Sequence, residues 1–518
     1  MQSHILSIIL FTPLVGALVL LFVPKTAKDA IRWIANLFAL AGFIVSLPLV
    51  PWFWAVKSQP GFKFIEGAPS NWIPSIGAGY YVGIDGISFL LIMLTTLLGW
   101  LSILSSWTAI EDRVKEYYIW FLVLQAGMLG VFMSLDFFLF YVFWEVMLVP
   151  MYLLIGIWGG PRKLYAAIKF FLYTLVGSVL MLLGILFLYF HHHTVTGVYT
   201  FNILELYKTA PQITGTAATL LFLAFFVGFA IKVPMFPFHT WLPHAHVEAP
   251  TAGSVILASI MLKMGTYGFL RFALPFFPGV AMSPTVRTTI LALAVVGILY
   301  GALVAMVQPD FKKLVAYSSV SHLGFVMLGI FALTLQSVQG AIMVMINHGI
   351  STGALFLLVG ILYERRHTRM IAAYGGIARV VPMFAALLTL VSLSSIGLPG
   401  TNGFIGEFLV LLGSFRTQPY MTFLSTLGVI LAAAYLLWAI QRILFNPLDK
   451  PENEHISDLN RRELVMMGAL VAAILWIGLY PAPILRRTEP AASRLVSAVS
   501  GAAPTRVARA GSAETAGR

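Results

Sequence analysis

Apolar runs of about twenty residues recur along nearly the whole chain and are separated by short polar stretches. A helix needs about 20 apolar residues to cross the roughly 30 Å hydrocarbon core of a bilayer. The pattern therefore predicts an all-α polytopic membrane protein with about fourteen transmembrane helices. The expected spans are residues 4–23, 31–50, 86–108, 117–134, 136–157, 166–190, 216–238, 251–274, 288–307, 314–334, 338–361, 383–411, 424–446 and 463–482.

The composition supports this fold class. The 518 residues are 59% hydrophobic and only 10% charged, whereas soluble domains carry about 25% charged residues. No alternating pattern of the kind found in membrane β-barrels occurs. The chain has no cysteine, which excludes thiolate-held iron–sulfur clusters and disulfides. The net charge of +12 is spread over loops without a basic, aromatic-interleaved patch, so no nucleic-acid partner is expected.

The polar stretches suggest the domain organisation. Residues 51–85 are rich in Gly, Pro and Trp and are expected to be ordered at a membrane interface, and residues 447–462 form a polar connector. The small, basic residues that follow the last span predict disorder. The expected parts are an N-terminal three-span segment (1–116), two five-helix units (117–275 and 286–446), a connector with the last span (447–483) and a disordered tail (484–518).

Positive charges indicate the orientation. Most Lys and Arg residues follow odd-numbered spans, as Lys312 and Lys313 do, and fewer follow even-numbered spans, as Lys63 and Arg271 do. The positive-inside rule then places both termini on the outer, periplasmic side. The first apolar run has no Lys or Arg before it and no small-residue cleavage site after it, so we interpret it as a span and not as a signal peptide.

Six ionisable residues lie inside the predicted spans. A charged group at the bilayer centre costs about 2.5–3.5 kcal/mol on insertion scales, so such groups pair, face water or line an ion pathway. One lone histidine would be an ordinary core residue, but six ionisable groups in different spans predict one polar pathway. The six are Glu145, Lys232, Lys263, His322, His348 and Glu407.

Two spans carry signals of a broken helix. In "FFVGFAIKVPMFPFHTWLP" (225–243), Pro234 and Pro237 directly follow Lys232. Each proline removes a backbone donor and disturbs the carbonyl four residues earlier, so we expect a hydrated interruption beside the lysine. In "SSIGLPGTNGFIGEF" (394–408), Pro399 and Gly400 precede Glu407 and predict a second interruption.

The two interruptions suggest an internal repeat. Broken spans at corresponding positions are typical of transporters built from inverted repeats. An offset of about 175 residues relates Lys232 to Glu407 and brings Glu145 close to His322. Because each copy would have five spans, the two copies would have opposite orientations. Pro150 is expected to loosen the helix near Val146, which would let water reach Glu145, the natural anion for Lys232.

Several stretches resemble the antiporter-like membrane subunits of NADH-quinone oxidoreductase (respiratory complex I), whose relatives include the Mrp cation/proton antiporters. The resemblance covers about residues 80–445. Glu407, at a position where the L and N subunits usually have lysine, and the lack of a lateral helix after the last span favour the subunit M, or chain 4, branch. The stretches are "YVGIDGISF" (81–89), "FWEVMLVPMYLLIGIWGG" (143–160), "YAAIKFFLYT" (165–174), "IKVPMFPFHTWLPHAHVEAPTAGSVILASIMLKMGTYGFLR" (231–271), "QPDFKKLVAYSSVSHLGFVMLG" (308–329), "INHGISTGALFLLVG" (346–360) and "LPGTNGFIGEF" (398–408).

The resemblance implies a role for each candidate residue. Glu145 and Lys232 would form the pair that gates a half-channel, and Lys263 would relay the proton centrally. His322 and His348 would continue the polar axis, and Glu407 would be the terminal site towards the outer face.

The resemblance also implies that redox chemistry takes place elsewhere. FMN, iron–sulfur clusters and quinone are expected in other subunits, and this chain is expected to hold no cofactor and no metal. Its expected partners are L-type and N-type subunits, lipids and protons, in a bacterial inner membrane.

Three other functions use the same residues. An Mrp-type antiporter subunit would carry Na⁺ near Glu145 or Glu407. A membrane subunit of an energy-converting hydrogenase would couple proton transfer to another redox reaction. A passive scaffold would tolerate the loss of Lys263.

Overall fold

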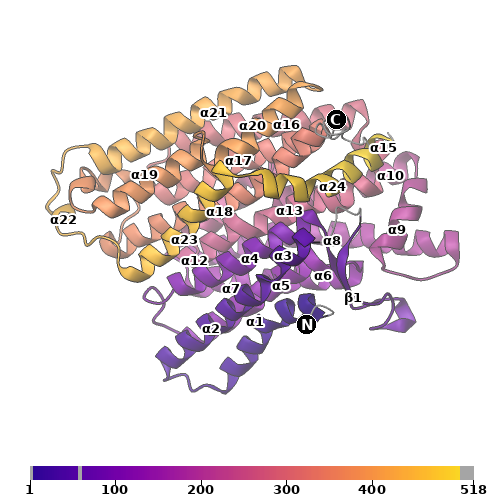
Figure 1. Cartoon of the computed structure of the whole chain (residues 1–518), viewed down its shortest axis with the longest axis horizontal. Coiled ribbons are helices and arrows are strands. Elements are labelled where there is room, and N and C mark those ends of the chain that lie inside the picture. The colour runs from indigo at the N-terminus through magenta and orange to yellow at the C-terminus, as the bar shows by residue number, and fades with distance from the viewer. Residues whose placement is uncertain (1–3, 56–60, 502–518) are drawn as a thin grey trace, which may run out of the picture.

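The computed structural model describes residues 4–55 and 61–501, and nearly all of this part is helical (Figure 1). Within it, thirteen helices are long and apolar enough to cross a membrane. Two shorter apolar helices, α19 (Pro382–Ile396) and α20 (Asn402–Phe415), add one interrupted span. The prediction of an all-α membrane protein with about fourteen spans is therefore confirmed.

The first half of the chain runs from the N-terminus to the first broken helix. Its only sheet among the described residues is an antiparallel pair, β1 (Lys63–Gly67) and β2 (Tyr81–Ile84). Its α-helices are α1 (Ile5–Phe22), α2 (Lys28–Ser46), α3 (Leu49–Ala55), α4 (Gly86–Ser105), α5 (Val114–Met133), α6 (Phe137–Val146), α7 (Leu148–Trp158), α8 (Lys163–Thr196), α9 (Ile203–Thr209), α10 (Gly215–Lys232) and α11 (Trp241–Glu248).

The second half contains the long central helices and three π-helical turns, η5 (Leu257–Met261), η6 (Phe269–Ala273) and η9 (Gln441–Phe445). Besides α19 and α20, its α-helices are α12 (Thr251–Ile256), α13 (Leu262–Gly268), α14 (Leu274–Phe276), α15 (Pro278–Ala281), α16 (Pro284–Met306), α17 (Phe311–Ala332), α18 (Leu335–Arg366), α21 (Pro419–Ile440), α22 (Pro451–Glu454), α23 (Arg461–Leu479) and α24 (Ala482–Ser500).

Burial divides the helices into an inner and an outer set. The segment from α12 to α14 and helix α18 are buried along their whole apolar stretch, and α17 nearly so. Helices α8 and α21 are buried over less than half of theirs and present apolar side chains to the outside. Polar groups on the inner helices are therefore shielded from lipid by other helices, as intramembrane charges require.

The first predicted interruption lies where the sequence places it. Helix α10 ends at Lys232, a 3₁₀ turn covers Phe238–Thr240, and α11 follows. Protein groups take up the backbone carbonyls freed near the break: the N–H of Met235 donates to Ala230 O at 2.9 Å, and Trp241 Nε1 donates to Ile231 O at 2.8 Å. The Ala230 carbonyl beside the break therefore has a polar partner within the protein, and the hydration of the break remains a prediction.

The second predicted interruption separates α19 from α20. Gly397 and Gly400 have φ of +88° and +90°, a conformation that residues with a Cβ rarely adopt. Pro399 lies between them, and α20 resumes at Asn402, so that Glu407 follows within its second turn. The fifth span is also divided as predicted, because α6 ends at Val146, four residues before Pro150.

Paired features support the predicted repeat. Asp136 caps α6 and Asp310 caps α17, each by accepting the N–H three residues on. Each aspartate also forms an isolated bridge to a later segment, Asp136 to Asn202 and Asp310 to Met370. The inverted relation of the two copies remains a prediction.

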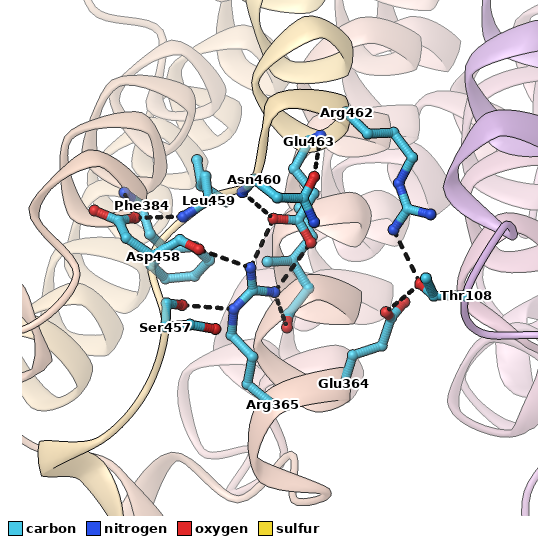
Figure 2. A network of polar contacts seen from close by, with 11 residues as sticks. Thr108, Glu364, Arg365, Phe384, Ser457, Asp458, Leu459, Asn460, Arg462 and Glu463 are labelled. Atoms are coloured by element: carbon cyan, nitrogen blue, oxygen red, sulfur yellow. Dashed lines mark hydrogen bonds and ion pairs between the residues drawn. The ribbon is translucent and has the colours of Figure 1, made fainter.

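A polar network ties the connector before α23 to three helices (Figure 2). Arg365, at the end of α18, lies 2.6 Å from Glu463 in the first turn of α23 and donates to the Asp458 carbonyl at 3.1 Å. The Asp458 carboxylate accepts the N–H groups of Met383 and Phe384 at 2.9 and 3.0 Å. The network therefore fixes the first turn of α19, the first half of the second broken helix, to α18 and α23.

The predicted disorder of residues 484–518 is wrong for residues 484–500. This stretch forms most of α24, which buries Ile484, Leu495 and Val499 and packs on α4, α14, α15 and α18 (yellow in Figure 1). Its average composition is polar, which hides an apolar face that repeats with the period of a helix. Residues 502–518 lie outside the described part of the chain.

Candidate functional site

The structure buries five of the six candidate residues. Lys232, Lys263, His322, His348 and Glu407 expose between 0% and 6% of their surface. Glu145, on α6, is half-buried. Burial on inner helices is what a protein pathway shielded from lipid requires.

Four of the residues form one continuous series. Lys263 Nζ lies 2.6 Å from Nδ1 of His348, and the rings of His348 and His322 are 5.7 Å apart. His322 Nδ1 lies 2.8 Å from Glu407 Oε1. The series links α13, α18, α17 and α20, so the predicted association of these groups is seen in the geometry.

A π-helical turn positions the lysine. Lys263 comes two residues after the end of η5, and its Nζ donates to the Ala258 carbonyl at 2.5 Å. π-Helical turns leave backbone carbonyls without their usual partner and occur frequently at functional sites. With one donor used on Ala258, the amine still has a donor for Nδ1 of His348.

A small cavity lies between the two histidines and the second helix break. His322, His348, Glu407 and Gly403 line it, and it has about 20 Å³ of room for the centres of water-sized spheres. A cavity holds a water when this volume exceeds roughly 10–15 Å³ and polar partners are present. Nε2 of His348 has no hydrogen-bond partner among the described residues. The cavity can therefore accommodate a water at the gap between the two rings.

An amide and hydroxyl network forms the wall of this cavity on the side of the break. Asn402 Oδ1 accepts from Ser394 Oγ at 2.5 Å and from Ser351 Oγ at 3.2 Å. Asn347 Nδ2 donates to the Asn402 carbonyl at 2.6 Å. These bonds fasten α18 to both halves of the second broken helix, and sequence reasoning did not identify them because Ser and Asn carry no formal charge.

Glu145 and Lys232 are near each other but do not form a closed ion pair. The part of the chain that the structure describes offers Lys232 Nζ no carboxylate within 4 Å and no hydrogen-bond acceptor. Instead Nζ lies 5.3 Å from the centre of the Trp144 ring and 5.7 Å from that of Phe170. Glu145 Oε1 is buried without a hydrogen-bond partner. In the structure the two residues of the predicted gating pair are therefore separated. The faces of the two aromatic rings can stabilise a positive charge on Lys232.

His246, on α11 after the first break, was not singled out from the sequence. It is completely buried on α11, stacks on Phe356 at 4.6 Å, and neither ring nitrogen has a partner within the described residues. Its ring is near enough to Lys263 and Lys312 for their charges to act on it. The sequence feature that could have identified His246 is its position three residues after Pro243, in the second half of a broken helix.

The structure corrects the position of Lys312, which the sequence pattern placed in a loop. It lies in the first turn of α17, exposes 6% of its surface, and donates from Nζ to the Ala249 carbonyl at 2.6 Å. This bond joins α17 to the end of α11. The sequence pattern misplaced the residue because the two adjacent lysines of "FKKL", at the edge of an apolar span, suggest a solvated loop. In the structure only Lys313 is partly exposed.

Arg271 is a second correction, since it belongs to the π-helical turn η6 and not to a loop. Its Nη2 lies 2.8 Å from Asp85, the residue that caps α4. Burial raises the pKa of Asp85, but the Arg271 charge and the N–H of Ser88 outweigh it and hold this pKa below its ordinary value. The pair is buried and anchors the start of α4 to the π-helical turn η6.

Comparisons with known proteins agree with the geometry. Residues 134–433 match a family model described as NADH:quinone oxidoreductase/Mrp antiporter, TM, and residues 64–135 match one described as NADH-ubiquinone oxidoreductase chain 4, amino terminus. The NADH-quinone oxidoreductase subunit M of Rhodobacter capsulatus is 48% identical over 96% of this chain and 97% of its own length.

Solved structures give the same picture. A chain of the respiratory complex I from Thermus thermophilus superimposes with a TM-score of 0.85 and 33% identity, over 96% of this chain and 100% of that one. A chain of the Mrp complex from Dietzia sp. DQ12-45-1b gives a TM-score of 0.80 at 20% identity, over 96% and 99%, which shows a common fold. The chain therefore belongs to the family of antiporter-like membrane subunits that NADH:quinone oxidoreductases share with Mrp antiporters.

Proposed function

We propose that this chain is the subunit M of an NADH-quinone oxidoreductase and that it translocates protons within the membrane arm. The single observation that carries the pathway is the continuous series from Lys263 through His348 and His322 to Glu407. Its members are buried on four different helices; Lys263 and Glu407 each lie within hydrogen-bond distance of a histidine, and a cavity that can hold a water lies at the 5.7 Å gap between the two rings. The 48% identity with a named subunit M supports the place in the complex.

One pair of histidine tautomers gives a direction of proton transfer. With a protonated Lys263 donating to Nδ1 of His348, Nε2 of the neutral ring carries the hydrogen and faces the cavity. With an ionised Glu407 accepting from Nδ1 of His322, Nε2 of His322 is the accepting nitrogen. A proton given by Lys263 to His348 is then released at Nε2, crosses the cavity water to Nε2 of His322, and leaves from Nδ1 to Glu407.

The separated Glu145 and Lys232 form the entry to this series. A nearby carboxylate favours the charged ammonium, so approach of Glu145 would hold a proton on Lys232 and its withdrawal would release one. His246, between the break and Lys263, is placed to receive it. We propose that a charge change in a neighbouring subunit drives this movement, and that flavin, clusters and quinone reside on other subunits.

The test is proton pumping by the intact complex reconstituted in liposomes. Lys263→Met removes the donor to His348 and is expected to abolish most NADH-driven acidification while the complex still assembles. Lys313→Met, at the partly exposed start of α17, is the matched control and should pump normally. Normal pumping by Lys263→Met would refute the pathway and favour a scaffold.

The Mrp-type function makes a different prediction in the same vesicles. An antiporter would give acidification that depends on a Na⁺ gradient and not on NADH. The energy-converting hydrogenase alternative predicts genes for hydrogenase subunits, and not for NADH-binding subunits, beside the gene for this chain.

A further inference from the structure

Helix α24 brings three arginines to the point where α4 begins. Arg486, Arg487 and Arg494 line a recess together with Lys63 of β1 and the capping residue Asp85. The recess is small, with about 20 Å³ of room for the centres of water-sized spheres, as in the cavity between the histidines, and it is partly open to the outside. Helix α24 lies directly against the start of α4, since a Cβ built on Gly86 would meet the Arg487 carbonyl carbon at 3.0 Å.

The recess carries much more positive than negative charge. Asp85 is the one acidic residue among the described residues of its lining, and it already pairs with Arg271 at 2.8 Å. Its other oxygen is 4.0 Å from Arg494. Burial and then the charges of Arg487 and Arg494 lower the pKa of Lys63, so the cations act on one another. A bound anion would offset this repulsion.

The position of the recess selects the source of the anion. Helix α24 begins at Ala482, shortly after the span α23 ends at Leu479, and packs its apolar face on α4, α14, α15 and α18. Phe53, which ends the span Lys28–Phe53, forms another wall. The recess is therefore at the depth where spans end, which is the depth of lipid headgroups.

We propose that this recess binds the phosphate group of an anionic membrane lipid. Planar guanidinium groups bind phosphate oxygens through two parallel hydrogen bonds, and three arginines with one lysine surround the space. The acyl chains would lie along the apolar ends of α3 and α23. The proposed proton pathway uses none of these residues, which lie around the start of α4 and share no lining residue with the cavity between His322 and His348.

The test uses the full-length protein in detergent, with the subunits that stay bound to it. Phosphatidylglycerol with short acyl chains is titrated in, and bound lipid is counted by native mass spectrometry. We expect one saturable site in the wild type. Arg487→Gln with Arg494→Gln should bind about 30-fold more weakly, since each basic residue contributes about 1 kcal/mol to anionic lipid binding and 1.4 kcal/mol is tenfold.

Controls separate lipid binding from folding and from subunit contacts. Arg416→Gln removes an exposed positive charge from the end of α20 and should leave the affinity unchanged. Arg486→Gln changes only an exposed side chain, so it cannot act through loss of the fold, and it should weaken binding about fivefold. Unchanged affinity in both cluster variants would overturn the proposal. Binding of phosphatidylcholine as tight as that of phosphatidylglycerol would also overturn it. If the arginine variants lost a neighbouring subunit but still bound phosphatidylglycerol, the recess would bind a protein partner, and the proposal would be overturned as well.

Discussion

Gly406 is the residue next to Glu407, and replacing it with alanine tests whether the pathway depends on helix spacing. A Cβ at this position would lie 2.7 Å from Cγ2 of Val344 and 2.8 Å from its backbone nitrogen. Ordinary contact begins near 3.4 Å, so α20 must move away from α18 by about 0.6 Å. The backbone nitrogen cannot yield as a flexible side chain would, and overpacking of this kind costs about 1–3 kcal/mol.

The displacement matters because Glu407 moves with its helix. A shift of about 0.6 Å would stretch the 2.8 Å contact between His322 and Glu407 to about 3.4 Å, beyond the range of a good hydrogen bond. Hydrogen bonds to charged groups contribute about 1.5–3 kcal/mol, and each 1.4 kcal/mol is tenfold in rate. We therefore expect NADH-driven proton uptake by proteoliposomes to slow at least about tenfold in Gly406→Ala.

The control is another helical glycine with free space around it. Nothing lies within 4 Å of a Cβ on Gly468 of α23, so Gly468→Ala should pump normally and gain slightly in stability. The assay is the ratio of acidification to NADH oxidised, with assembly checked by size-exclusion chromatography. Equal ratios in Gly406→Ala and Gly468→Ala would show that the contact between α17 and α20 is not part of the pathway.

Three further predictions concern residues that sequence reasoning did not select. Asp85→Asn leaves Arg271 buried without its carboxylate and should lower the free energy of unfolding, measured by thermal denaturation, by about 3–5 kcal/mol. The control is Asp29→Asn in the exposed pair with Arg32, which should change the free energy of unfolding by less than about 1 kcal/mol. Because the folded pKa of Asp85 is depressed, its contribution is present above the unfolded pKa of about 3.9 and is lost as pH falls through the folded value, so the two proteins should converge in stability in acid. His246→Phe removes no hydrogen bond within the described residues and can keep the stack on Phe356, so it should lower pumping without lowering the melting temperature; normal pumping would exclude His246 as a relay. Asp458→Ala removes the carboxylate that accepts two N–H groups at the start of α19, so it should lower the free energy of unfolding by about 0.5–2 kcal/mol. Hydrogen exchange at Met383 and Phe384 should become faster; unchanged exchange there would contradict the anchoring.

The fold was largely predictable because a bilayer imposes strict rules on sequence. Apolar length sets the spans, and proline or paired glycines set the breaks, as at Pro234 and Gly400. Burial of Lys263 and His348 followed from their place inside apolar runs. Their mutual contact did not, because it depends on how α13 and α18 pack and on the π-helical turn before Lys263, neither of which has a local signal.

The errors have equally physical origins. Lys312 and Arg271 lie at the ends of apolar runs, where one residue decides between a solvated loop and a buried helix turn. The separation of Glu145 from Lys232 depends on how α6 and α10 pack, which sequence spacing cannot give. Helix α24 was missed because its apolar face is narrow and its average composition is that of a disordered segment.

The docking of α24 also has a consequence for how the protein is made. Asp85 and the start of α4 leave the ribosome early in synthesis, whereas Arg487 and Arg494 emerge only near the end. Until then the first turn of α4 lacks the cover that α24 gives it in the finished structure. The last helix described thus acts as a closing step for the first part of the bundle, and ribosome-bound chains stalled before residue 482 should be cleaved by added protease near α4, while completed chains resist.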